Sequence, residues 1–548
     1  MLAWLARYGH RYEPFVIAEE ASSGELIGLL TLAVERASGR VFTAGTHHAE
    51  YQSWLARPGA SDAFMRAAAT ELRSCFPTGT LQFLFVPPGA PLGFTDQEVR
   101  HRRAEVHTNS RGVLAVGDGA DIEASLRKKS NRSRLQRLAR HGEVSFEQLE
   151  TVEQLDAVLD DIVDFCDLRQ GAIHDVLPFA DDPDKREWYR DLMRAGLLHA
   201  TVLKVGGALA AAHLGVRDGD RVILGLIVHS PFFAEHSPGK LQLLLLGQLL
   251  ARQGIAALDL TPGGAYKERF QSEQEMVRVL TLFFSERDAL RHLAHRVARH
   301  AVRLVRADTD RLRRVAREWH ARFRTQRAAD VPRKLLNRGR RLLWESWESR
   351  IYLFPVERAS TIQRTGTLRK NDLRALLAFR PAADSVATRG AFLREALSRL
   401  EQGQHVYTYV ENGVLAHYVW LVERQERASL AAVDQEMLVP ADSAVAFDAY
   451  THPTARGKGI YRAALTDLLC EAASIPGTKY VCSCLLSHIG ASRHLVDSFG
   501  FEYQGSFFKT TRFGRRRRWC EMPPSWPRPQ LPALTADATR PTAAALHS

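Results

Sequence analysis

The chain has 548 residues, of which 45% are hydrophobic and 25% charged, so it is a globular protein with room for three or four domains. Its six cysteines lack disulfide or zinc spacing, which excludes a secreted disulfide scaffold and favours a reducing compartment. The first residues lack a signal-peptide pattern, and the longest apolar run, at 241–250, is too short to span a bilayer. We therefore expect a cytoplasmic protein.

The first predicted unit, residues 1–120, begins with apolar strands near Leu26 and Val41. A helix follows from Ser61 to Cys75, and a strand at 81–86 ends in a Pro-Pro-Gly turn. These elements alone do not indicate a function.

The second predicted unit, residues 121–285, opens with a strongly basic helix that ends at Gly142. The helix is either a solvated crossing segment or a source of cationic contacts to an anionic ligand. Two helices and a set of strands follow, at 151–170, 184–196, 199–205, 208–216, 221–229 and 255–260, with a further helix between the last two strands.

Two places in this second unit are candidate binding sites. Ser237, Gly239 and Lys240 open a helix, where unpaired N–H groups and the helix dipole favour an anion. Further candidates converge at a strand end and the turn after it, where open sheets bind ligands: Asp259, Tyr266 and Lys267. The nearby histidines lack metal-ligand spacing on one element, so we expect no metal there: His213, His229 and His236.

Residues 286–349 form a predicted helical connector that carries the charge of the whole chain. Residues 286–341 hold 18 cationic and 6 anionic side chains, a net of +12. An apolar stripe along the helix suits packing on neighbouring elements or peripheral contact with a membrane surface. Nucleic acid is the least favoured partner, because no helix-turn-helix or zinc module accompanies the cations.

The third predicted unit, residues 350–522, contains the most informative stretch of the chain. Strands at 405–410 and 414–422 form a hairpin around Asn412-Gly413, and the strand at 444–450 leads into the turn Arg456-Gly457-Lys458-Gly459. The amphipathic helix after this turn makes it a candidate anion site. A strand at 479–486 follows, and residues 523–548 are predicted to be a disordered tail.

Residues 386–512 resemble a GNAT (Gcn5-related) acetyltransferase. The stretch THPTARGKGIYRAALTDLL resembles the acyl-CoA pyrophosphate loop and helix, and ASRHLVDSFGF resembles the second core motif. The resemblance implies acetyl-CoA as the acyl donor, an amine as the acceptor and no metal. It also implies phosphate contacts from the backbone N–H groups of Arg456, Gly457, Lys458, Gly459 and Ile460, with added charge from the Lys458 side chain.

This third unit departs from the family pattern at two positions. Ile489 replaces the usual Asn of the second motif, although Ser492 fits the small residue after it, and Val496 replaces the frequent general-acid tyrosine. Tyr503 or Ser506 are the candidate substitutes for that acid. Asp448 and Tyr450, two residues apart on a strand, are expected to share a face and relay the amine proton, or else are rim residues.

Residues 126–270 resemble the acetyltransferase-like domain of CelD-type cellulose-biosynthesis proteins, through KKSNRSRLQRLARHG, HSPFFAEHSPGKLQLLLLGQLLARQG and DLTPGGAYKERF. Residues 26–116 resemble the partial GNAT half that precedes such domains. The predicted fold class is therefore α/β, with repeated GNAT-like mixed-sheet units joined by the basic connector.

The predicted function is acyl-CoA-dependent N-acyltransfer, with surface polysaccharide synthesis implied by the CelD resemblance alone. A Fem-like transferase that uses charged tRNA and a non-catalytic GNAT-fold scaffold remain as alternatives. The run Arg515 to Arg518 is either a contact for the 3′-phosphate of CoA or a solvated edge.

Overall fold

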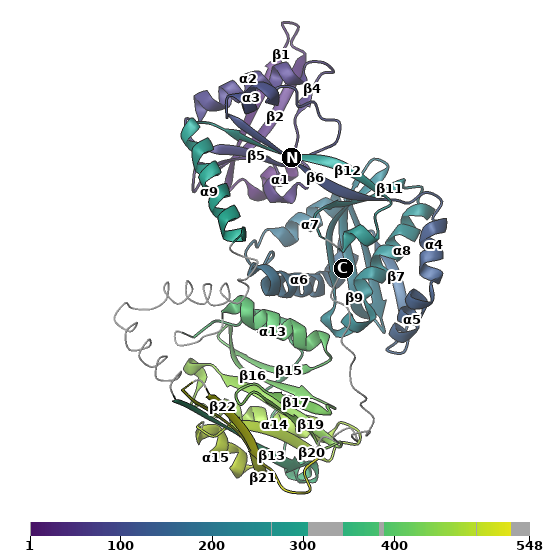
Figure 1. Cartoon of the computed structure of the whole chain (residues 1–548). Coiled ribbons are helices and arrows are strands. Elements are labelled where there is room, and N and C mark those ends of the chain that lie inside the picture. Colours follow the sequence, from purple (N-terminus) through teal and green to yellow (C-terminus); the bar gives the residue numbers. More distant parts are fainter. Residues whose placement is uncertain are drawn as a thin grey trace, which may run out of the picture. The chain divides into compact units, whose positions relative to one another are not determined.

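The computed structural model describes residues 2–264, 266–304, 344–382, 388–488, 490–513 and 515–527 (Figure 1). They form two compact units. Unit 1 comprises residues 1–322 together with 386–402, and unit 2 comprises residues 323–385 and 403–548. Both units are built on mixed sheets with helices against them, which confirms the predicted α/β class with repeated mixed-sheet units.

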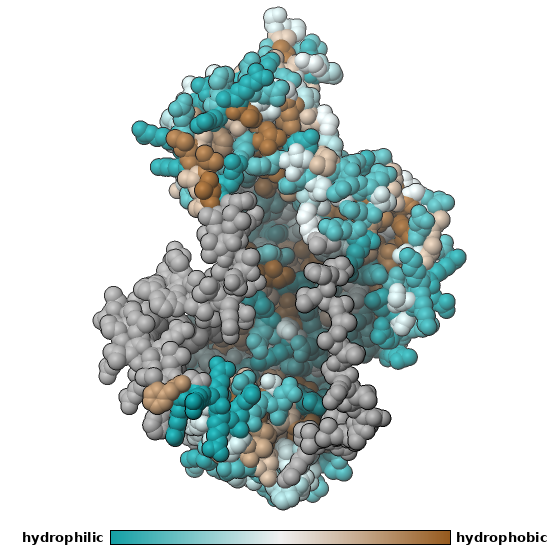
Figure 2. All heavy atoms as spheres, in the orientation of Figure 1, coloured by the Kyte–Doolittle hydropathy of each residue, from teal (hydrophilic) through white to brown (hydrophobic). Residues whose placement is uncertain are grey.

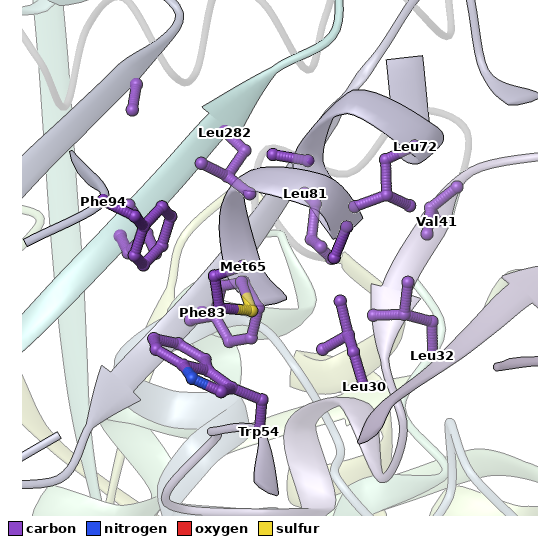
Figure 3. Packing of buried hydrophobic residues seen from close by; sticks show 14 of the residues in the cluster. Leu30, Leu32, Val41, Trp54, Met65, Leu72, Leu81, Phe83, Phe94 and Leu282 are labelled. Carbon is purple, nitrogen blue, oxygen red and sulfur yellow. The ribbon is translucent and has the colours of Figure 1, made fainter. Parts of the chain in front are cut away.

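Unit 1 begins with a small sheet and its own core. Strand β2 pairs with β1, β3 and β4, all antiparallel. The buried face of helix α2 packs with β2 and β5, as Figure 3 shows for Met65, Leu72, Leu30 and Phe83. The bounds are α1 (Leu2–Tyr8), β1 (Tyr12–Glu20), β2 (Leu26–Glu35), β3 (Val41–Thr43), η1 (Thr46–His48), β4 (Leu55–Ala56) and α2 (Ser61–Cys75).

The main sheet of unit 1 has eight strands in the order β5-β12-β6-β11-β10-β9-β8-β7. Strands β5 and β6 precede residue 120, so the predicted boundary at that residue falls within one continuous sheet. The strands are β5 (Thr80–Val86), β6 (Ala104–Ala115), β7 (Val144–Leu149), β8 (Leu198–Val205), β9 (Ala208–Asp218), β10 (Arg221–His229), β11 (Ala257–Pro262) and β12 (Glu273–Phe283).

Helices surround this sheet. The predicted basic helix is divided in two at Lys128, whose backbone is extended (ψ 135°). The helical elements are α3 (Thr95–Arg100), α4 (Ala120–Arg127), α5 (Lys129–Leu138), α6 (Val152–His174), α7 (Lys185–Arg194), η2 (Pro231–His236), α8 (Pro238–Arg252), η3 (Lys267–Arg269), α9 (Glu286–Leu304) and α13 (Arg389–Glu401).

Helix α13 belongs to unit 1 by its contacts, although its sequence lies within the predicted third domain. It packs on α6, and the Arg169 guanidinium donates to Glu401 at 2.8 Å. The Arg389 guanidinium also donates to Asp175, at 3.1 Å. The order of elements along the chain therefore differs from their grouping in space.

Unit 2 contains a second eight-stranded sheet, in the order β14-β15-β16-β19-β20-β13-β21-β22. Its strands are β13 (Trp344–Pro355), β14 (Arg369–Lys370), β15 (His405–Glu411), β16 (Val414–Val422), β19 (Ser443–Thr451), β20 (Tyr480–Leu486), β21 (Glu502–Arg512) and β22 (Arg515–Glu521), with β17 (Arg427–Leu430) and β18 (Gln435–Leu438) as a separate hairpin. The helical elements are η6 (Val356–Thr361), α12 (Leu373–Leu377), η7 (Pro453–Ala455), α14 (Ile460–Ala473) and α15 (Gly490–Ser498).

The two large sheets share their strand order from one edge almost to the other. In unit 1, the early strand β6 lies antiparallel between β11 and β12. In unit 2, the early strand β13 lies antiparallel between β20 and β21 in the same way. The parallel pairs are β10 with β11 and β19 with β20. The sequence predicts repeated GNAT-like mixed-sheet units, and the described residues contain two full copies of this strand order.

Two further predicted boundaries fall inside the described structure. Strand β13 begins at Trp344, within the predicted connector. Residues 523–527, at the start of the predicted tail, contain Trp526, whose side chain is buried and whose Nε1 donates to the Leu438 carbonyl at 3.0 Å. Residues 305–343 of the connector and 528–548 of the tail lie outside the described residues.

Candidate functional site

The turn before α14 has the geometry that an anion site requires. Gly457 and Gly459 both have φ of 77°, in the left-handed region that favours glycine, and no atom would meet a Cβ added to either. Gly459 is the N-cap of α14, and residues 456–459 are exposed. The first N–H groups of the helix therefore face open space, where an anion can reach them.

The parallel strands beside this turn separate after a short stretch of pairing. Pairing of β19 with β20 runs from Ser443 to Ala446 and stops there, although β19 continues to Thr451. A cavity of about 30 Å³ lies where the strands part, beneath α14. This volume holds about one water molecule. Residues of β16, β19, α14 and β20 line it, including His417, Asp448, Tyr461, Leu465 and Cys484.

His417 is the most unusual polar group in this cavity. Its side chain is fully buried, and its Nδ1 lies 2.9 Å from the Thr451 hydroxyl. Its Nε2 is buried and has no hydrogen-bond partner. Burial lowers the pKa of His417 to about 4, so at neutral pH the imidazole is uncharged.

Asp448 and Tyr450 do not lie in a regular strand. Residues 448 and 449 together face Val419, which makes a two-residue bulge, and Asp448 has φ of 50°. The bulge interrupts the alternation of side chains along the strand, and the prediction that Asp448 and Tyr450 share a face depended on that alternation. Asp448 lines the cavity, and the Tyr450 ring stacks on Tyr418 at 5.4 Å.

The side chains with predicted proton or phosphate roles have definite partners. The Tyr503 hydroxyl lies 2.8 Å from Ser506, whose Oγ donates to Glu348, and Tyr503 is not among the cavity-lining residues. Lys458 Nζ is paired with Glu411 at 2.7 Å, and Arg456 Nε donates to the Thr451 carbonyl.

The second motif lines the cavity at Val496 and contacts a cavity-lining residue, Tyr461, through Ser492. Val496 lines the cavity as a buried apolar residue. Burial raises the pKa of Tyr461, and a hydrogen bond with Ser492 partly offsets that rise. Tyr461 therefore places a hydroxyl group near His417, with ring centroids 5.5 Å apart. Ile489 lies outside the described residues.

The corresponding helix start in unit 1 is more enclosed. Ser237 is the N-cap of α8 with φ of 53°, and the preceding η2 contacts α5 and α13. A Cβ added to Gly239 would lie 3.2 Å from His229. Burial lowers the pKa of Lys240, and the charges of Arg134, Lys128 and Arg269 lower it further. The cations around this helix start favour an anion.

A second polar cluster lies at the end of β11 in unit 1. Asp259 is 1% exposed and accepts from the Tyr51 hydroxyl at 2.8 Å and from Arg111 at 2.5 Å. Arg111 is also buried and donates to Glu275. The structure thus surrounds the predicted Asp259 with side chains from β6, β12 and the segment after η1.

Thr261 links two further charged residues to this cluster. Lys267 Nζ donates to the Thr261 hydroxyl at 2.7 Å, and the Thr261 side chain also forms a hydrogen bond with Glu50. Burial raises the pKa of Glu50 and lowers that of Lys267. Thr261 has φ of 58°, a strained conformation for a β-branched residue. Tyr266, the third predicted residue, is 46% exposed.

Among the described residues, two groups bring histidine nitrogens and carboxylate oxygens together: His47, His48 and Asp182, and His141, Glu235 and His236. In the first group, Tyr8 lies 2.9 Å from His48, and Arg11 lies beside Asp182. In the second, the Nε2 atoms of His141 and His236 are 3.2 Å apart, within hydrogen-bonding distance. His236, where no metal was expected, thus belongs to a group whose ligand atoms could hold a metal ion. His213 and His229 belong to neither group.

The comparison with protein families assigns the central part of unit 1. The family described as acetyltransferase (GNAT) domain matches residues 125–272. This part of the chain is therefore similar to GNAT acetyltransferase domains. The match covers the stretch from α5 to the turn after β11, with Asp259, Thr261 and Lys267, and does not reach the turn at 456–459.

Among solved structures, a tandem GNAT protein from the clavulanic acid biosynthesis pathway is 13% identical, with 68% of this chain and 99% of that chain covered and a TM-score of 0.23. FemX is 9% identical, with 51% and 90% covered and a TM-score of 0.35. L-PGS from Bacillus licheniformis is 12% identical, with 51% and 86% covered and a TM-score of 0.32. These values are too low to carry an argument about function. No curated protein matches the chain.

Sequence reasoning missed several residues of both clusters. His417 is a lone polar residue in the apolar strand VLAHYVWLV, and that contrast was the available signal. Glu50, Tyr51 and Arg111 give no comparable signal, because they lie outside any motif. They are also far from Asp259 in sequence, and even Arg111, the nearest of the three, is 148 positions away.

Proposed function

We propose that the protein is an acyl-CoA-dependent N-acyltransferase whose donor site in unit 2 lies between the 456–460 turn and the separated ends of β19 and β20. The observation that carries this proposal is the cavity at the strand separation, directly beneath the helix that the open glycine turn begins. Phosphates would bind the N–H groups of the turn, and the acyl group would extend toward the cavity.

The reaction we propose is direct transfer. The lone pair of the amine attacks the thioester carbonyl, the carbon–sulfur bond breaks, and the thiolate leaves with the electron pair. The amine must lose a proton, and we assign His417 Nε2 as its acceptor, because this nitrogen has no hydrogen-bond partner and His417 lines the cavity. The role requires the tautomer in which Nδ1 carries the proton and donates to the Thr451 hydroxyl. Asp448, at the bulge, is the second candidate, and the acid that protonates the thiolate is not assigned.

Calorimetric titration of acetyl-CoA into the full chain tests the donor site. We expect binding by the wild type and at least about a tenfold loss in Gly457→Glu, Gly459→Glu, because the new carboxylates repel phosphate and the positive φ disfavours a side chain. Gly403→Glu is the matched control, since that glycine has φ of 76° and equally open surroundings. Absence of heat with the wild type would refute the donor assignment.

The alternative is aminoacyl transfer from charged tRNA, in the manner of Fem-type enzymes. The cations Lys128, Arg134, Lys240 and Arg269 near the start of α8 favour it, since an RNA backbone needs such contacts. Transfer of a labelled amino acid from charged tRNA, without acetyl-CoA, would support this alternative. An amino sugar of surface polysaccharide synthesis remains a proposed acceptor for the acyl-CoA reaction.

We also propose peripheral membrane contact through the basic segment at 286–341. On α9, the apolar side chains Leu290, Leu293 and Val297 are 43–58% exposed, next to Arg287 and Arg291. Figure 2 shows hydrophobic atoms over this helix. In the described part of the chain, no helix is long and apolar enough to cross a bilayer.

A further inference from the structure

The hairpin of β21 and β22 is an edge of the unit 2 sheet with an unusual charge. Residues 509–518 contain six cationic side chains and no Asp or Glu. Arg515, Arg516, Arg517 and Arg518 are all exposed. Figure 2 shows strongly hydrophilic atoms gathered over β22. Nothing in the proposed acyl-transfer site uses these residues.

The pairing of the two strands sets like charges against each other. Arg512 lies directly opposite Arg515, and Lys509 lies opposite Arg518. Like charges at directly opposed positions destabilise a hairpin. Arg518 is paired with Asp434 at 3.3 Å, and the Arg517 guanidinium lies 5.6 Å from the centroid of the Trp519 ring. Glu345 on β13 lies in register with Thr511, which faces Arg516 on the other side. An external anion would relieve the repulsion between these opposed cations.

The tip of the hairpin adds an apolar element. Phe513 is 83% exposed, the largest exposure among the large hydrophobic side chains of the described residues, and has φ of 50°. In sequence it lies between Arg512 at the end of one strand and Arg515 at the start of the other. An exposed phenylalanine between cations suits a lipid interface, where the ring enters the acyl region and the guanidinium groups reach phosphates.

We propose that the β21–β22 hairpin is a docking surface for anionic lipid, with Phe513 inserted and Arg515, Arg516 and Arg517 bound to headgroup phosphates. A nucleic acid would match the cations but would leave the ring at the tip without an apolar environment. The proposal is independent of the acyl-transfer site and of α9.

The test is flotation of the full chain with vesicles of phosphatidylglycerol and phosphatidylcholine, compared with phosphatidylcholine alone. We expect binding only to the anionic vesicles. The variant Arg515→Gln, Arg516→Gln, Arg517→Gln should lower the partition coefficient on the order of 100-fold. The matched control Arg369→Gln, Arg380→Gln, Arg427→Gln removes the same charge from exposed positions of unit 2 and should change it by about twofold at most.

The variant Phe513→Ser is a second test. It should lower the partition coefficient about tenfold, and this loss should persist in high salt, because the substitution removes apolar contact and no charge. Wild-type binding by the triple Gln variant would overturn the proposal and assign any binding to another segment, such as α9. Hairpin-dependent binding to an RNA or DNA oligonucleotide, with no binding to vesicles, would overturn it as well.

Discussion

His213 and His417 occupy the same position in the two eight-stranded sheets. In unit 1, His213 lies two residues before Gly215, which faces a two-residue bulge at Leu224 and Gly225. In unit 2, His417 lies two residues before Val419, which faces a two-residue bulge at Asp448 and Ala449. Both histidines are fully buried, and both contain ring nitrogens without hydrogen-bond partners. The repeat thus extends from strand order to individual side chains.

Buried His213 should make the stability of unit 1 depend on pH. Burial lowers its pKa to about 3, below the value near 6.5 of the unfolded chain, so the unfolded state takes up the proton first. The free energy of unfolding should therefore fall as pH drops below about 6.5, by about 2 kcal/mol at pH 5. Denaturant titrations should show a flatter pH dependence for His213→Leu, and an unchanged one for the exposed control His101→Gln.

Substitution of His417 should affect turnover more than donor binding. If its Nε2 accepts the amine proton, His417→Gln should lower kcat by about 100-fold or more and leave the acetyl-CoA affinity within about twofold. Steady-state kinetics with calorimetry measure both quantities. An unchanged kcat would show that another group, with Asp448 the next candidate, takes the proton.

The ion pair of Arg111 and Asp259 should be costly to break. Arg111→Met leaves the Asp259 carboxylate buried with one partner fewer, so we expect the free energy of unfolding to fall by about 3–5 kcal/mol. Arg221→Met, at a half-exposed arginine beside Glu275, should cost less than about 1 kcal/mol. Equal effects of the two substitutions in chemical denaturation would contradict this assignment.

Asp467 should stabilise unit 2 through a backbone segment. Its carboxylate accepts from the N–H groups of Thr365, Gly366, Thr367 and Leu368 at 2.6–3.0 Å. Burial alone would raise its pKa, but these hydrogen bonds outweigh burial and lower it. The stabilisation is therefore present above pH 4 and is lost as pH falls through the lowered pKa. Asp467→Ala should cost about 2–4 kcal/mol at pH 7, measured by thermal unfolding, and less at pH 3.

The sequence predicted local elements well where a single pattern decided them. The α2 helix and strands β10 and β16 have the predicted bounds, because periodicity and turn residues agree there. Strand β6 was not predicted, since its centre reads His-Thr-Asn-Ser-Arg and only pairing with β11 and β12 makes it a strand.

The candidate sites also differ in how far the sequence could predict them. The turn at 456–460 is a local feature, so its backbone could be anticipated from two glycines before an amphipathic helix. The cluster around Asp259 depends on which strands are neighbours in the sheet, and the chain reveals that only after folding. The bulge at Asp448 is likewise set by strand register, which the sequence pattern does not specify.

The membership of α13 in unit 1 has a consequence for biosynthesis. The ribosome must synthesise the chain as far as residue 402 before α13 can pack on α6. Strands β13 and β14 of unit 2 precede α13 in the sequence, so they have already been synthesised at that point. Unit 1 therefore finishes folding after synthesis of unit 2 has begun. A fragment that starts near residue 350 would present the apolar side of α13, including Leu393, without the helix that normally covers it.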